Sequence, residues 1–158
     1  MNCYIFAIEP MGAAYAELVA FCCLLASKMI LIVRDPQKDP GDAIKQKLAR
    51  LEACRIETVL AREWPGTVLH AHDAAVHWYQ VTADLEQGMR ELAPRLYAWA
   101  HSGGAPEDPC FFRADGQVVL VTVAHEHDAY LMLTESELLL LQERFPNLAS
   151  LLREEGEK

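Results

Sequence analysis

The 158 residues are 52% hydrophobic and 23% charged, which is enough apolar surface for one folded domain and too much for a disordered chain. The formal net charge of −9 is uneven, because residues 1–102 hold 12 acidic and 10 basic side chains whereas residues 103–158 hold 11 and 4. No stretch concentrates Lys and Arg, so a nucleic-acid partner is disfavoured, while a basic protein surface would be attracted to the C-terminal third.

Cysteine spacing and hydropathy predict a cytoplasmic protein without a membrane span. The five cysteines include one adjacent pair and no Cys-x-x-Cys, so they favour neither a disulfide framework nor a zinc ribbon. Residues 13–33 are strongly apolar, but Glu17 and Lys28 interrupt them. The uninterrupted part is only ten residues long, whereas a bilayer of about 30 Å needs about 20.

The first 54 residues predict a strand–helix–strand–helix segment. Short apolar runs at 2–8 and 29–33 indicate buried strands. The helix between them, at 13–26, is apolar on nearly every face, so neighbours must cover more than one side of it. Asp42 is a suitable N-cap for a further helix over 42–54.

Residues 55–101 predict three strands followed by a helix. The strands are expected at 55–61, 67–70 and 76–81. Thr82 would cap a helix that Pro94 kinks or splits, with one buried face formed by Leu85, Met89, Leu92, Leu96 and Trp99. Glycines and prolines between His101 and Pro109 then indicate an internal linker.

The same order recurs in residues 110–144. Strands are expected at 110–113, 117–124 and 130–133, the first two joined by a turn at Asp115-Gly116. A capping box from Thr134 to Glu137 begins a helix that ends near Arg144, and a last short helix is expected at 148–153, before a frayed tail.

A short internal repeat supports the parallel between these two stretches. Residues 67–74 (Thr-Val-Leu-His-Ala-His-Asp-Ala) match residues 122–129 (Thr-Val-Ala-His-Glu-His-Asp-Ala) at six of eight positions. We therefore predict a single α+β domain over residues 1–158. It would contain a mixed, mainly antiparallel sheet covered by helices, with a possible internal duplication of a three-strand-plus-helix unit.

The repeated segments have two interpretations. Histidines two apart on a strand face the same way and can share a zinc ion with a carboxylate, which would suit a metal-binding protein or a metal-dependent hydrolase. The candidate ligands are His70, His72, Asp73, His125, His127 and Asp128. The other interpretation is purely structural, because His and Asp tolerate the tight backbone of a hairpin loop. We prefer the structural interpretation, which implies no cofactor.

No other catalytic pattern is complete. Cys110, His125 and Asp128 are the residue types of a thiol triad, but they lack a nucleophile motif. The preferred function is therefore a non-enzymatic, acidic interaction module, such as a bacterial inhibitor or immunity protein that binds a basic partner. Its candidate contact residues are Glu107, Asp108, Asp115, Glu126 and Glu135. A further alternative is a structural subunit that dimerises through the apolar helix at 13–26.

Overall fold

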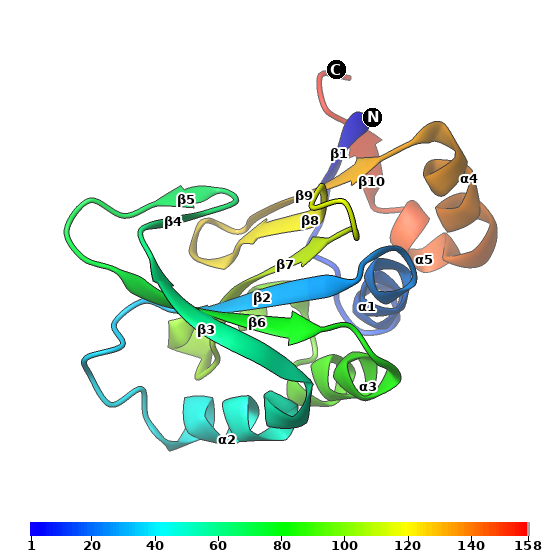
Figure 1. Ribbon diagram of the computed structural model, residues 1–158. Helices are drawn as coiled ribbons and strands as arrows, with labels where there is room; N and C mark the ends of the chain where they lie inside the picture. Colours follow the sequence, from blue (N-terminus) through cyan, green and yellow to red (C-terminus); the bar gives the residue numbers. More distant parts are fainter. Residues whose placement is uncertain (158) are drawn as a thin grey trace.

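The computed structural model describes residues 1–157 and is built on one large antiparallel sheet (Figure 1). The strand order is β10-β1-β9-β8-β7-β2-β6-β3, and every neighbouring pair is antiparallel. The strands of this sheet are β1 (Asn2–Phe6), β2 (Lys28–Val33), β3 (Arg55–Ala61), β6 (Ala74–Gln80), β7 (Glu107–Phe112), β8 (Val118–Val123), β9 (Asp128–Leu133) and β10 (Leu152–Glu154).

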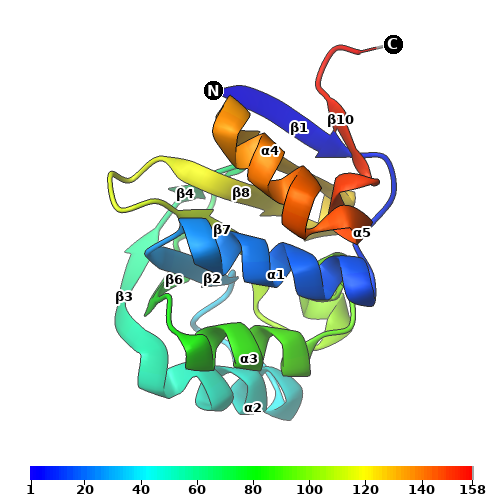
Figure 2. The same cartoon turned by 90° about the vertical axis from the view of Figure 1, so that its right-hand side faces the viewer.

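The helices form a layer on one face of this sheet (Figure 2). They are α1 (Ala13–Leu25), α2 (Asp42–Leu51), α3 (Ala83–Leu92), α4 (Glu135–Arg144) and α5 (Pro146–Ala149). Short 3₁₀ turns lie at Glu52–Cys54, Leu96–Ala98, His101–Gly103 and Ala124–Glu126. This arrangement confirms the α+β class, with a sheet that is antiparallel rather than mixed. Across the described residues, every helix is too short or too polar for a membrane span.

The main core lies between the sheet and the helices, and α1 is at its centre. α1 packs against α3 and α5, so its nearly all-round apolar sequence is matched by neighbours on several sides. Buried polar groups at its contact with α3 are paired. The Tyr15 hydroxyl donates to the Met89 carbonyl at 2.6 Å and accepts from Trp99 Nε1 at 2.8 Å.

The opposite face of the sheet is covered in part by a two-stranded hairpin, β4 (Glu63–Trp64) and β5 (Thr67–Val68). A second apolar cluster lies there, built from Ile30, Ile32, Trp64, Ala74, Val76, Cys110 and Val121. Gly66 in the hairpin turn has φ +89°, and a Cβ atom there would lie 2.7 Å from Val123 Cγ2. Glycine thus allows the hairpin to approach β8 closely.

Elements with strong local signals lie close to where the sequence predicts them. α1 matches the helix expected at 13–26, and the Thr82 and Thr134 side chains both cap helices, Thr134 within a complete capping box. α3 ends at Leu92, so Pro94 does separate it from the turn at Leu96–Ala98. β1 and β2 flank α1 as expected but are separated in the sheet by β9, β8 and β7.

Several predicted elements are corrected by long-range contacts. The helix expected at 148–153 ends at Ala149, and residues 152–154 instead pair with β1 as β10. The second part of the expected linker at 101–109 is packed into the protein, because Ala105 is 1% exposed and β7 already begins at Glu107. Asp42 is the first residue of α2, and the N-cap is Gly41.

The predicted three-strand-plus-helix unit is complete only in its second copy. There β7, β8 and β9 are neighbours in the sheet and lead into α4. In the first copy β3 and β6 are neighbours, but the strand expected between them is shortened to β5 and leaves the main sheet. The two copies therefore share a final strand, a capping Thr and the following helix, while the segments before that strand differ.

Candidate functional site at the histidine-bearing end of the sheet

One end of the sheet gathers most of the histidines. Because neighbouring strands are antiparallel, β2 and β8 end where β6, β7 and β9 begin. The loops at this end hold five of the six histidines, namely His70, His72, His101, His125 and His127. Both repeated segments thus reach the same end of the molecule.

Arg34, directly after β2, connects these loops. Its Nε donates to Glu107 Oε2 at 2.8 Å, and its guanidinium lies 5.5 Å from the Trp64 ring centre. Its Nη2 lies 3.2 Å from His125 Nδ1, and its carbonyl oxygen lies 2.9 Å from His72 Nε2. Since a guanidinium can only donate and a carbonyl can only accept, these contacts place a lone pair on His125 Nδ1 and a proton on His72 Nε2.

Asp108 is the most buried charged group at this end. Its side chain has no exposed surface, and its backbone has a φ of +57°. One carboxylate oxygen accepts from the Ala124 backbone N–H at 2.9 Å, and the other accepts from Trp64 Nε1 at 3.3 Å and lies 3.5 Å from Arg34 Nη2. Burial raises the pKa of Asp108 despite these donors. Asp108 therefore ties the hairpin and the β8–β9 connection to β7.

The candidate metal ligands are divided among separate contacts. His72 and His125 contact Arg34, and Asp73 pairs with Arg62 at 3.1 Å. His127 has a φ of +53° and stacks on Tyr97 with ring centres 5.3 Å apart. His70 lies in the exposed loop before β6, and Asp128 begins β9.

Among residues 1–157, no group of three or more His, Cys, Asp or Glu side chains is placed to hold a metal ion. Zinc binding remains an alternative to be tested.

The five candidate contact residues divide into two groups. The Asp108 side chain is fully buried and that of Glu107 is only 10% exposed, and both carboxylates form ion pairs with Arg34 inside the protein. Asp108 is thus corrected from a surface contact to an interior group. Asp115, Glu126 and Glu135 are exposed and stay available to a partner.

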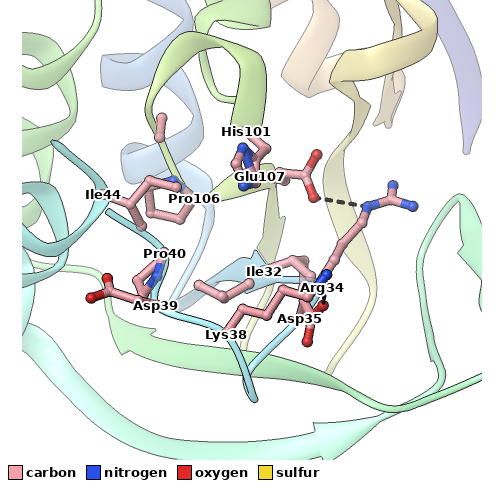
Figure 3. Close-up of a pocket in the computed structure, with 12 residues that line it drawn as sticks. Ile32, Arg34, Asp35, Lys38, Asp39, Pro40, Ile44, His101, Pro106 and Glu107 are labelled. Carbon is pink, nitrogen blue, oxygen red and sulfur yellow. Dashed lines mark hydrogen bonds and ion pairs between the residues drawn. The ribbon is translucent and has the colours of Figure 1, made fainter. Parts of the chain in front are cut away.

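A small cavity of about 180 Å³ lies beside this cluster, between the loop after β2 and the segment before β7 (Figure 3). Ile32, Ile44 and Pro106 supply apolar walls, and His101 lies at the cavity. The Glu107 carboxylate turns toward Arg34 (Figure 3). No local motif pointed to Arg34, because it lies 73 residues from Glu107 in the chain.

The thiol-triad residue types do not form a nucleophilic site. Cys110 is fully buried, and burial raises the pKa of its thiol to about 12. Its Sγ lies 3.4 Å from the Asp108 carbonyl oxygen, while His125 contacts Arg34. A thiol that is buried and protonated at neutral pH is a poor nucleophile.

Comparison with known proteins adds no relatives, since no family model, no curated protein and no solved structure matches the chain.

Proposed function

We propose that this protein is a non-enzymatic interaction module that binds a basic protein partner, as a bacterial inhibitor or immunity protein does. The observation that carries the proposal is the uneven pairing of charges between the two parts of the chain. Most cations are already neutralised by nearby carboxylates, and a large group of exposed carboxylates in the C-terminal third is not.

Most of the Lys and Arg side chains form ion pairs with carboxylates of the same chain. Within residues 1–157, eight of the 13 Lys and Arg side chains form ion pairs with carboxylates, and seven of these eight precede residue 103. They are Arg34, Lys38, Lys45, Arg50, Arg55, Arg62, Arg95 and Arg113. Their positive charge is therefore largely balanced locally.

Carboxylates after residue 103 form ion pairs with Lys or Arg less often than carboxylates earlier in the chain. Within residues 103–157, seven exposed acidic side chains have no ion pair with Lys or Arg, namely Asp115, Glu126, Asp128, Glu135, Glu143, Glu155 and Glu157. Exposed charge of one sign attracts a partner of opposite sign and raises its association rate. A basic protein surface is the complementary partner.

The chemistry at the histidine-bearing end is consistent with a binding protein. Arg34 pairs with both Glu107 and Asp108, so these charges hold the fold together. The exposed Glu126 and Asp128 lie beside this internally paired cluster, on the connection between β8 and β9 that Asp108 fixes through the Ala124 N–H. A contact surface on a well-fixed scaffold needs little ordering when it binds.

The experiment is a capture assay with two variants of matched charge. One neutralises Glu126, Asp128 and Glu135 to Gln, Asn and Gln, and the other neutralises Asp42, Glu57 and Glu63 to Asn, Gln and Gln. Wild-type protein and the second variant should retain the same basic partner at low salt, and the first variant and high salt should release it. Retention that ignores salt, equal loss in both variants or no capture at low salt would refute the proposal.

A further inference from the structure

The outer surface of α1 forms the floor of an open groove on the helical side of the protein. Ala20, Cys23 and Leu24 line the floor, Glu86 of α3 lies along one wall, and Arg144 at the end of α4 lies along the other. The groove has a volume of about 470 Å³. Figure 2 shows α1 between α3 on one side and α4 and α5 on the other. None of the groove residues belongs to the histidine-bearing end of the sheet.

The groove exposes apolar surface because α1 has more apolar faces than its neighbours cover. The only charged residue of α1, Glu17, turns toward α5 and accepts from the Leu148 backbone N–H at 2.7 Å. The sheet, α3 and α5 cover Leu18, Phe21 and Cys22, but Leu24 remains 50% exposed. Burying the exposed part of Leu24 against a second surface would remove apolar area from water, which is favourable.

The two walls carry opposite charges that are not neutralised within the protein. Among residues 1–157, neither Glu86 nor Arg144 forms an ion pair, although Arg90 lies one turn from Glu86 on α3. One wall is therefore acidic and the other basic. A surface with this arrangement is complementary to itself, because a twofold rotation exchanges its two walls.

We propose that a second copy of this chain occupies the groove and that the protein is a twofold-symmetric dimer. The axis runs along the groove between the two copies, so that Glu86 of each copy faces Arg144 of the other. The small Ala20 and Cys23 side chains allow the two α1 helices to approach closely, and Leu24 packs against the floor of the second copy. Since a stable interface buries about 1,200–2,000 Å² in total, the contact continues over the adjoining surfaces of α3 and α4.

The test measures mass in solution by sedimentation at micromolar concentration. Wild-type protein should be a dimer, and Glu86→Arg and Arg144→Glu should each be monomers, because each places like charges opposite each other. An equimolar mixture of the two single variants should form a heterodimer, since both walls of the first variant are then basic and face the two acidic walls of the second. Glu63→Arg, in the hairpin on the opposite face of the sheet, should stay dimeric.

Circular dichroism and thermal unfolding confirm that each variant is folded before its mass is interpreted. A wild-type monomer would overturn the proposal, and so would dimers that persist in both single variants. Two monomeric variants that fail to associate on mixing would also overturn it, because the pairing of Glu86 with Arg144 would then not be the contact between copies. None of these outcomes depends on whether a basic partner is found.

Discussion

His72 and His125 come from the two repeated segments, and both contact Arg34. His72 Nε2 meets the backbone carbonyl, and His125 Nδ1 meets the guanidinium. The segments thus converge on one residue from different loops, although the strands that precede them differ. Their common role in the structure is to hold the loop after β2 against the end of the sheet.

Replacing Asp108 should reveal how strongly it holds this end together. Asp108→Ala removes the acceptors of two buried N–H groups, on Ala124 and Trp64, and leaves a side chain without polar atoms at φ +57°. Each unsatisfied buried donor costs about 1–3 kcal/mol, so for two donors we expect a loss of stability of about 2–6 kcal/mol, measured by urea unfolding at neutral pH.

The pH dependence of Asp108 has a defined sign. Burial raises its pKa in the folded protein, so the unfolded chain releases this proton at a lower pH than the folded one. The contribution of Asp108 to stability is therefore largest below its unfolded pKa and falls as pH rises through the folded pKa. In urea unfolding from acid to neutral pH, wild-type protein should lose stability relative to Asp108→Asn. A difference that is constant with pH would contradict this.

Glu137 should show the opposite pH dependence. Partial burial acts to raise its pKa, but hydrogen bonds from Arg113 and the Thr134 backbone N–H outweigh it and lower the pKa. Its stabilising effect is thus present above the unfolded pKa and is lost as pH falls through the folded one. Glu137→Gln should cost about 1 kcal/mol at neutral pH and much less in acid. An unchanged cost in acid would show that charge is not involved.

Substituting two glycines in turn distinguishes the stability cost of backbone strain from that of steric overlap. Gly41 has a φ of +92°, and a Cβ atom added there would have nothing within 4 Å, whereas a Cβ at Gly66 would meet Val123. Gly41→Ala should therefore cost only the strain of a positive φ, about 1 kcal/mol. Gly66→Ala should cost more, because the hairpin must also move away from β8. Equal losses in thermal unfolding would mean that the hairpin moves freely.

Adding zinc distinguishes the metal-binding interpretation of the repeated segments from the purely structural one. His125 accepts from Arg34 through Nδ1 and would have to leave that contact to bind an ion, and the other candidate ligands are not gathered into one group, so we expect zinc to leave the melting temperature unchanged and a chelator to have no effect. Zinc-dependent stabilisation that disappears in a variant with His70 and His127 replaced by Ala would support the metal alternative. Elemental analysis of purified protein gives an independent measurement.

Local signals in the sequence predicted much of the secondary structure. The α+β class, α1, the Thr82 and Thr134 caps and the interruption at Pro94 follow from side chains only a few residues apart. The histidine pairs were also visible as a repeat, but their partner Arg34 was not. Nothing near Arg34 in the chain distinguishes it from any other arginine after a strand.

What the sequence by itself determined is therefore the class of fold, the positions of its principal helices and the acidity of its last third, since each depends on composition or on neighbouring residues. Tertiary structure alone decided that the 67–68 strand leaves the sheet, that residues 152–154 become an edge strand and that Asp108 lies inside. It also brought Arg34 to Glu107 across 73 residues. Such contacts depend on which surfaces meet when the chain packs, and no local pattern of side chains encodes that.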